Sequence, residues 1–315
     1  MRAITMIICC LFLQLGMVAQ KDITVLHVSG QAFYYEQTGA KAISMYPGME
    51  LALKGRMRCK GASTAKLLYN GVSIMVSGGK LRDLKEVVKS AGVASQMSFT
   101  GRFFSFVTES VREGNTQEDI KKYHRKYMGK TSGGIKGYAK PDYTIRPLLL
   151  TAGKLPSANV IFKWRNTAGE GHYTFSLLTK LGKPVAQILT RDTAITLDLD
   201  QLALDLDEEY SWNVSRGETA KSVNIPFEIC PTSVVERLTD LSHEPAFVEA
   251  EPEMKQMMLA YRLEEERCFY SAYQTYTQLI GAEPDNLLLR RMYAAFLARM
   301  DMLPEASSLL FSSNN

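Results

Sequence analysis

Two short stretches decide the fold, Val160-Ile-Phe-Lys-Trp164 and Tyr210-Ser-Trp-Asn-Val214, and they hold the two tryptophans of the chain. Both are rich in β-branched and aromatic residues, which favour strands. Alternate side chains of a strand point to the same face, so each stretch presents two aromatic rings on one face. We expect Trp164 and Trp212 in the core of a β-sandwich, and not on an exposed sugar-stacking platform.

Other strand-like runs surround these two stretches, at 148–151, 172–178, 185–190, 194–198 and 223–229. Short strands separated by turns predict an antiparallel sandwich over 141–231. The acidic run at 198–209 lacks the Asp-x-Asp-x-Asp-Gly spacing of a calcium loop, so we expect an exposed loop or short helix there.

Three aromatic patterns in this block resemble fibronectin III and immunoglobulin-like domains. They are the strand ending in Trp164, a Tyr-x-Phe-x-Leu strand from Tyr173 and the late Tyr-x-Trp-x-Val strand from Tyr210. The resemblance implies an Ig-like fold but no ligand.

Residues 22–85 read as a second, smaller β module, a barrel or sandwich of short strands. Its strand-like runs are 23–28, 31–36, 49–53, 64–69 and 72–77. The last two flank Asn70-Gly71, which accepts the positive φ angles of a type I′ turn and therefore predicts a tight hairpin.

This module resembles the FecR-type periplasmic domain. The matching residues are Val25, Val28 and Gly30, then Pro47-Gly48 before a strand, then Ser63-Thr64-Ala65 leading to the hairpin at Asn70-Gly71. The resemblance implies a periplasmic β module with an interaction role. In that family's signalling proteins a membrane helix and a cytoplasmic anti-sigma region precede the domain. Neither is evident in this sequence, so we do not expect that signalling role.

Residues 86–140 predict a basic, partly helical connector. A helix is expected from Gln117 to Tyr127, with Asn115 or Thr116 as its N-cap. Lysines, arginines and tyrosines alternate over 121–140, which we interpret as a solvated basic face. Contact of this face with an anionic surface stays open, and nucleic acid is not an expected partner.

The Gly129-Lys130-Thr131 run resembles the end of a phosphate-binding loop. The first glycine of that motif would stand at position 124, which is His124. No strand-like run leads into it either, so the motif is rejected.

Residues 232–315 have apolar residues at helical spacing and are similar to tetratricopeptide repeats. On a register starting at Glu253, the matching residues are Leu259, Ala260, Ala272, Tyr276, Leu279 and Pro284, and in a second copy Leu287, Tyr293, Ala294, Leu297, Ala306 and Leu310. An earlier helix is expected near 233–239. Two copies are fewer than an independent solenoid needs, so the helices are expected to dock on the sandwich or on another protein.

The N-terminus predicts export. A short basic start precedes an apolar run at 3–18, and Ala19 offers a small residue for cleavage, which together indicate a signal peptide at 1–19. We expect a periplasmic protein, with secretion or a retained membrane anchor as less favoured alternatives. The mature chain keeps Cys59, Cys230 and Cys268. This odd set, one in each of three modules, indicates buried free thiols, although one pair bridging stays open.

No catalytic, metal or cofactor site emerges from the sequence. Histidines 27, 124, 172 and 243 stand in separate stretches, and no nucleophile elbow or His-Glu-x-x-His motif is present. Glu264-Glu265-Glu266 is interpreted as a solvated helix face. We therefore do not expect an enzyme, and we expect no cofactor.

The predicted fold class is a multidomain β plus α protein: a small β module, an Ig-like sandwich and C-terminal helical hairpins. The predicted function is a non-catalytic adaptor or scaffold of the cell envelope that binds other envelope proteins or peptides through the helical repeats. A glycan-binding envelope protein and a hydrolase with a site between modules are the alternatives. The residues predicted to contact a partner are Tyr261, Arg262, Tyr270, Arg290, Arg291 and Tyr293.

Overall fold

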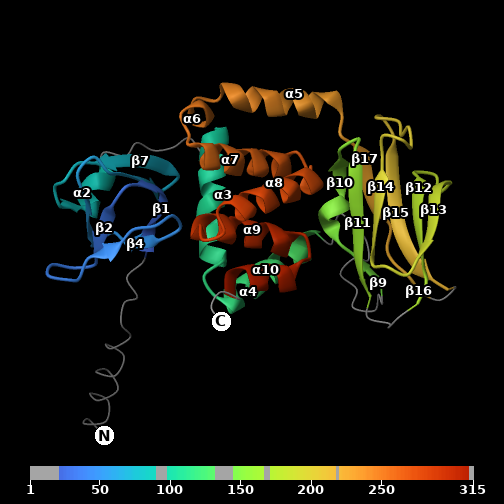
Figure 1. Ribbon diagram of the computed structural model, residues 1–315, viewed down its shortest axis with the longest axis horizontal. Helices are drawn as coiled ribbons and strands as arrows, with labels where there is room; N and C mark the ends of the chain where they lie inside the picture. Colours follow the sequence, from blue (N-terminus) through green and yellow to red (C-terminus); the bar gives the residue numbers. More distant parts are fainter. Residues whose placement is uncertain (1–20, 90–97, 132–144, 167–170, 218–219, 312–315) are drawn as a thin grey trace, which may run out of the picture. The chain divides into compact units, whose positions relative to one another are not determined.

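The computed structural model describes residues 21–89, 98–131, 145–166, 171–217 and 220–311 (Figure 1). The chain folds as two compact units, 1–108 and 109–315. The proposed signal peptide at 1–19 lies outside the described residues. Of the helices that the structure describes, none combines the length and the apolar character needed to cross a bilayer.

The first unit contains two four-stranded sheets, which confirms a small β module. Their orders are β4-β1-β6-β7 and β3-β2-β5-β8. The strands are β1 (Lys21–Ser29), β2 (Ala32–Tyr35), β3 (Ile43–Ser44), β4 (Glu50–Ala52), β5 (Arg56–Cys59), β6 (Thr64–Tyr69), β7 (Val72–Ser77) and β8 (Arg82–Asp83). Asn70 and Gly71 have φ angles of 48° and 77°, as a type I′ turn requires, so the predicted hairpin is confirmed.

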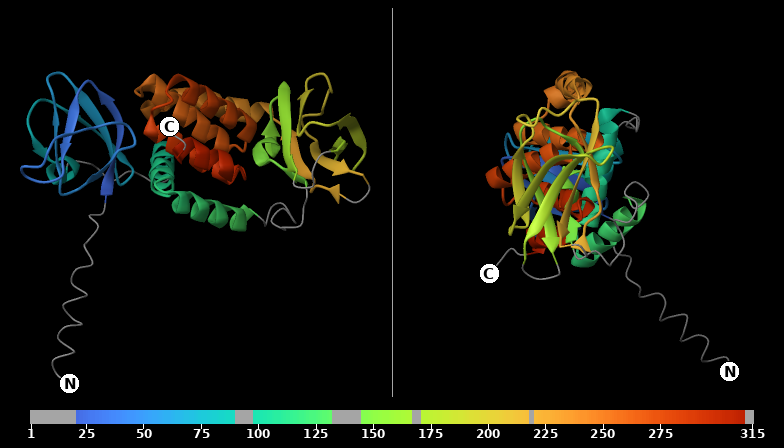
Figure 2. Two further views of the ribbon diagram at one scale, coloured as in Figure 1. Left: turned by 60° about the horizontal axis from the view of Figure 1, so that its bottom comes forward. Right: turned by 90° about the vertical axis from the view of Figure 1, so that its right-hand side faces the viewer.

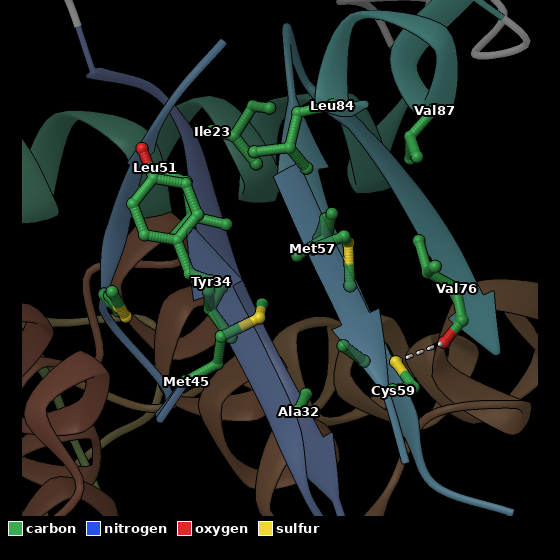
Figure 3. Close-up of a cluster of buried hydrophobic side chains, with 14 of the residues drawn as sticks. Ile23, Ala32, Tyr34, Met45, Leu51, Met57, Cys59, Val76, Leu84 and Val87 are labelled. Atoms are coloured by element: carbon green, nitrogen blue, oxygen red, sulfur yellow. Dashed lines mark hydrogen bonds between the residues drawn. The ribbon is translucent and has the colours of Figure 1, made fainter. Parts of the chain in front are cut away.

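One hydrophobic core fills this unit. Figure 3 shows Ile23, Leu51 and Met57 of the strands meeting Leu84 and Val87 of helix α2 (Leu84–Lys89). The Sγ of Cys59 donates to the carbonyl of Val76 within the same core, so this thiol is buried and free, as expected.

The residues that resemble the FecR-type pattern come together here. Gly30 has a φ of 79°, and a Cβ at this position would lie 2.4 Å from the Oγ of Ser63. That hydroxyl accepts a hydrogen bond from the backbone of Gln31. Gly48 donates from its backbone to Val25. The contacts explain why glycine and serine stand at these positions, while membership of the family stays a prediction.

Two longer helices follow, α3 (Phe99–Glu113) and α4 (Gln117–Thr131). The predicted helix at 117–127 is confirmed as α4, and its N-cap is Thr116, whose Oγ1 accepts from the backbone of Asp119 at 3.1 Å. Helix α3, in which one compact unit ends and the next begins, was not expected from the sequence.

The second unit begins its sandwich at residue 145. One sheet has the order β10-β17-β15-β12-β13, with β16 beside β15, and the other has the order β14-β11-β9. The strands are β9 (Ile145–Pro147), β10 (Gly153–Leu155), β11 (Asn159–Asn166), β12 (Tyr173–Thr179), β13 (Pro184–Thr190), β14 (Ala194–Asp198), β15 (Glu209–Arg216), β16 (Ala220–Lys221) and β17 (Ile225–Ile229).

The two opening stretches are strands β11 and β15, and their aromatic residues form the core. Phe162 of β11 lies edge-on to Trp212 of β15 at 5.3 Å between ring centroids, and 5.2 Å from Phe175 of β12. Trp164 packs against Tyr173. Such aromatic pairs add roughly 0.5–1.5 kcal/mol each beyond their buried area. The prediction that both tryptophans are core residues is confirmed, because Trp212 is 0% exposed and Trp164 only 3%.

One strand prediction in this region is wrong. Residues 148–151 form the 3-10 helix η2 (Leu149–Thr151) and not a strand. The run is buried throughout, and an unbroken apolar run does not distinguish a buried strand from a buried helical turn. The acidic stretch between β14 and β15 is a loop of turns with exposed carboxylates, as expected.

The C-terminal part of this unit is helical (Figures 1 and 2). Its helices are α5 (Thr232–Asp240), η3 (Leu241–His243), α6 (Pro245–Val248), α7 (Pro252–Glu265), α8 (Phe269–Ala282), α9 (Leu287–Arg299) and α10 (Leu303–Phe311). Helices α7 and α8 form one hairpin, and α9 and α10 form the second. Asn286 caps α9 with its side chain, which accepts from the backbone of Leu289 at 3.2 Å. The predicted helix near 233–239 and both helical hairpins are therefore present, and the tetratricopeptide resemblance stays a prediction.

Candidate functional site

A buried network of charged and phenolic side chains joins four helices of the second unit, α4, α7, α8 and α9. Glu264 of α7 accepts from Arg299 of α9, with 3.1 Å between Oε2 and the arginine Nε. Its other oxygen, Oε1, accepts from the hydroxyl of Tyr276 at 3.0 Å. Arg299 also donates to the hydroxyl of Tyr123 of α4. The network therefore ties the two helical hairpins to each other and to α4.

The environment of this network perturbs its titratable groups. Burial raises the pKa of Glu264, and the Arg299 charge and the Tyr276 hydroxyl partly offset that rise. Burial also raises the pKa of Tyr276, and the charge of Glu264 adds to the rise. Perturbed groups mark many active sites, but structural ion pairs perturb pKa values in the same way. Because the Glu264 and Arg299 side chains are less than a tenth exposed and bond to each other, the arrangement is that of a structural core.

The triple glutamate at 264–266 was predicted to be a solvated face, and this is wrong. Glu264 lies in the buried network, and Glu266 pairs with Arg237 of α5 at 2.8 Å. Glu266 also lies 3.9 Å from Lys154 of β10. The sequence does not reveal these contacts, because Arg299, Arg237 and Lys154 stand far from the three acids in the chain.

A second cluster centres on Asp301, in the turn between α9 and α10. Its Oδ1 lies 2.8 Å from Nε2 of His124, and its Oδ2 lies 2.8 Å from Arg146 of β9. Arg165 of β11 donates to the carbonyl of Asp301 at 3.0 Å and also pairs with Glu305. The sandwich, α4 and the helical hairpins therefore meet at one nearly buried carboxylate.

Nearby contacts extend this junction. The backbone of Ile161 donates to the hydroxyl of Tyr270, and that of Lys154 donates to the carbonyl of Arg267 at 2.9 Å. We name the junction made by Lys154, Arg165, Glu266, Tyr270 and Asp301 the sandwich–helix seam. The sequence left two docking partners open for the helical array, the sandwich or another protein, and the structure shows contacts with the sandwich.

The His124–Asp301 pair has the geometry of the base and orienting acid of a hydrolase. A nucleophile is the remaining requirement. Among the described residues, His124 makes no hydrogen bond to a serine, threonine or cysteine side chain. Asp301 is also shared with Arg146, so its charge serves an ion pair. The pair is best explained as part of the seam.

The three arginines predicted to bind a partner are engaged within the chain. Arg262 pairs with the glutamates three and four residues later, at 3.2 and 3.7 Å. Arg290 donates from Nε to the carbonyl of Leu309 at 2.9 Å. Arg291 lies against Gly114, where a Cβ would come within 3.1 Å of its side chain.

The three tyrosines of that set are buried. Tyr261 donates to the glutamate one turn later, and Tyr270 accepts from the backbone of Ile161 at the seam. Tyr293 stacks on Tyr276 at 5.4 Å and is also bonded to Thr277. The structure does not gather the six residues on one exposed face, so partner binding through them stays a prediction.

The first unit also has a groove between two sheet edges. It has a volume of about 410 Å³ and is lined by Ile74, Met75, Val76, Arg82, Asp83, Glu86 and Val87. The lining comes from β7, β8 and α2, and β7 and β8 each end a sheet. Met75 is 55% exposed, while Val76 belongs to the buried core. Sequence reasoning missed this site, although the hairpin that places β7 at the edge was predicted.

Comparison with known proteins adds no identity. Neither a protein-family model nor a curated protein sequence matches this chain.

Proposed function

We propose that this protein is a non-catalytic, exported interaction scaffold of the cell envelope, and that it recognises an extended polypeptide segment at the groove of its first unit. The observation that carries the proposal is a groove between the open edges of two sheets. The signal-peptide pattern at 1–19 supports export.

The edge strand β7 offers backbone groups for strand addition. It pairs with β6 through a two-residue hairpin, so Tyr69 and Val72 form the closing hydrogen-bonded pair. Hydrogen bonding alternates along an antiparallel ladder. The N–H and C=O groups of Ser73, Met75 and Ser77 therefore point toward the open edge. An extended peptide can bond to these groups, as in other cases of β-strand addition.

The lining of the groove selects for an apolar strand. Ile74, Val76 and Val87 supply an apolar floor, and Met75 adds an adaptable thioether at the rim. The charges at the rim are mixed, because Asp83 lies 3.7 Å from Arg56 and Glu86 pairs with Lys89. Affinity should therefore come from backbone bonds and alternating apolar side chains rather than from net charge.

The alternatives have less support. A glycan site would use an exposed aromatic platform, and both tryptophans are buried in the sandwich core. A hydrolase would use His124 and Asp301, which are held in the sandwich–helix seam.

Two variants of β7 test the proposal. Ser73→Pro removes an outward N–H without removing a bond to β6, and Met75→Lys places a charge on the rim. A library of fluorescent seven-residue peptides with alternating apolar positions is titrated by anisotropy. We expect selected peptides to bind the wild type and to weaken at least tenfold on both variants, which is the loss of about 1.4 kcal/mol.

The matched control is Leu181→Lys, which adds the same charge at a 95% exposed leucine of the second unit. It should leave peptide binding unchanged. Circular dichroism confirms that each variant is folded. Peptides that bind wild type, Ser73→Pro and Met75→Lys equally, or a library that yields no binder, would refute recognition at this groove.

A further inference from the structure

The sheet β3-β2-β5-β8 of the first unit presents aromatic and basic side chains next to one another on one face. Phe33 of β2 lies opposite Arg58 of β5, and Tyr35 lies opposite Arg56. Successive side chains of a strand point to opposite faces of the sheet, so these four share a face. Each ring on β2 therefore has a guanidinium as its cross-strand neighbour, with about 5 Å between their Cβ atoms.

Burial shows that this face is the outer one. The other face of the same two strands packs into the core shown in Figure 3, through Ala32, Tyr34, Met57 and Cys59. Phe33 and Tyr35 are only partly buried, and Arg58 is exposed. The rings and the cations therefore lie on the solvent side of the sheet.

One further residue on each side extends this face. The backbone of Lys60 donates to the carbonyl of Gln31 at 2.9 Å, which continues the pairing of β5 with β2. Alternation places Lys60, which is exposed, on the side of the arginines. On the β3 side, the backbone of Met45 donates to the carbonyl of Ala32 at 2.9 Å. Met45 is buried, and the next residue, Tyr46, is 48% exposed.

The aromatic–basic face, as we name it, consists of Phe33, Tyr35, Tyr46, Arg56, Arg58 and Lys60. It has an excess of positive charge. Arg56 donates to the hydroxyl of Thr38 and lies 3.7 Å from Asp83. Within the described part of the chain, Arg58 and Lys60 form no ion pair. Residues 21–89 carry eleven lysines and arginines against five acidic residues. The face therefore complements an anionic ligand.

The dimensions of the aromatic–basic face favour a narrow, chain-like ligand. Three neighbouring strands span about 10 Å, and five residues along β2 span about 14 Å. A standard protein interface covers about 800 Å² on each partner. The face is several times smaller than that, so it suits a linear polymer better than the surface of a folded protein.

We propose that the aromatic–basic face binds a linear acidic polysaccharide whose sugar units carry carboxylates. Each unit of such a polymer offers both of the groups that the face can hold. The C–H side of a sugar ring packs on an aromatic ring, and a carboxylate accepts two parallel hydrogen bonds from a guanidinium. An acidic polypeptide lacks the ring. Single-stranded nucleic acid has rings and charge, but the signal-peptide pattern at 1–19 favours a ligand outside the cytoplasm.

This site is separate from the peptide groove and from the sandwich. The groove is lined by β7, β8 and α2 and shares no residue with the aromatic–basic face. The tryptophans of the sandwich are buried, so the rings that a sugar can reach are those of the first unit. The inference therefore does not depend on peptide recognition.

The test uses the chain without residues 1–19 and a fluorescent decamer of galacturonic acid, titrated by anisotropy in about 50 mM salt, where screening is weak. Three probes of the same length are compared with it. The methyl-esterified decamer keeps the rings without the charge, and deca-glutamate keeps the charge without the rings. A thymidine decanucleotide has both, with phosphate in place of carboxylate. We expect the galacturonate decamer to bind roughly tenfold more tightly than each of the three.

Two variants locate the binding. Arg58→Gln removes one positive charge of the face, and Tyr46→Ser removes an exposed ring. Each should weaken binding of the galacturonate decamer roughly tenfold. Lys183→Gln is the matched control, because it removes the same charge from an exposed position of the second unit, and it should leave binding unchanged. Circular dichroism confirms that each variant is folded.

Four outcomes overturn the inference: a galacturonate decamer that does not bind, an esterified decamer or deca-glutamate that binds as tightly, a decanucleotide that binds more tightly, or variants that bind like the wild type. Met75→Lys, in the peptide groove, should keep binding to the decamer, and Arg58→Gln should keep binding to the selected peptides. The two proposals therefore fail independently.

Discussion

At the residue scale, Gly153 shows how one position without a side chain supports the sandwich–helix seam. Its φ is 83°, in the left-handed region that only glycine adopts freely. A Cβ there would lie 2.4 Å from the carbonyl oxygen of Arg267. The neighbouring Lys154 donates to that same carbonyl. The close approach of β10 to the start of α8 therefore depends on the missing methyl group.

We predict that Gly153→Ala lowers the free energy of unfolding by about 2–4 kcal/mol, because it adds a steric clash with backbone to a strained φ. Gly182→Ala is the matched control, since Gly182 has a φ of 80° but nothing within 4 Å of the added Cβ. It should cost only about 1 kcal/mol. Urea denaturation followed by circular dichroism measures both. Equal losses for the two variants would show that the contact with Arg267 is unimportant.

At the scale of elements, the Glu264–Arg299 pair joins consecutive helical hairpins, and Tyr123 extends it to α4. Removing one member of a buried ion pair leaves the other charge without compensation, which costs about 3–5 kcal/mol. Among residues 117–127 of α4, whose burial the structure describes, Ile120 and Tyr123 are the buried side chains. Its attachment should therefore be sensitive to the state of this pair.

We predict that Arg299→Met destabilises the second unit by about 3–5 kcal/mol, and that Glu264→Gln in the same chain restores part of the loss by removing the stranded charge. A double-mutant cycle in urea measures this coupling. Arg125→Met serves as the control, because Arg125 pairs with Glu118 in an exposed position and should contribute less than about 1 kcal/mol. Strictly additive losses in the cycle would contradict direct coupling of Glu264 with Arg299.

Elements specified by neighbouring residues could be predicted from the sequence. The Asn70-Gly71 turn, the Thr116 cap of α4 and the helical hairpins depend on interactions within a few residues. Contacts between distant residues could not. Glu264 and Arg299 stand 35 residues apart, and His124 and Asp301 stand 177 apart. No local pattern indicates such pairs, so the acids at 264–266 were placed in solvent.

The groove of the first unit was missed for the same reason. It is built from strand edges that only the completed topology brings together. The prediction of a strand at 148–151 was wrong for a different reason. The run is buried throughout, so it lacks the alternation of buried and exposed residues that distinguishes a strand from a helical turn.

At the scale of the whole molecule, residues 109–315 form one compact unit, in which charged groups join the sandwich to the helices. Glu266 is central, with Arg237 of α5, Lys154 of β10 and Arg262 of α7 around it. Hydrogen bonding from Arg237 holds the pKa of Glu266 below its usual value, and the charges of Arg237, Arg262 and Lys154 act in the same direction. Protonation of this one carboxyl should therefore loosen the contact between the sandwich and the helical hairpins.

The pKa of Glu266 is lower in the folded chain than in the unfolded chain, so its ionised form stabilises the fold. This contribution is fully present above the unfolded pKa of about 4.3, and it is lost as the pH falls through the lower, folded value. We predict that exchange of the Lys154 amide hydrogen, corrected for its intrinsic pH dependence, accelerates below about pH 4.5 in the wild type. Glu266→Gln should exchange faster at neutral pH and show a flatter response to acid. Glu208→Gln, at an exposed glutamate, should follow the wild-type profile. If Glu266→Gln keeps the full acid response, another group controls the sandwich–helix seam, and the ion pairs of Glu266 are not what holds the second unit together.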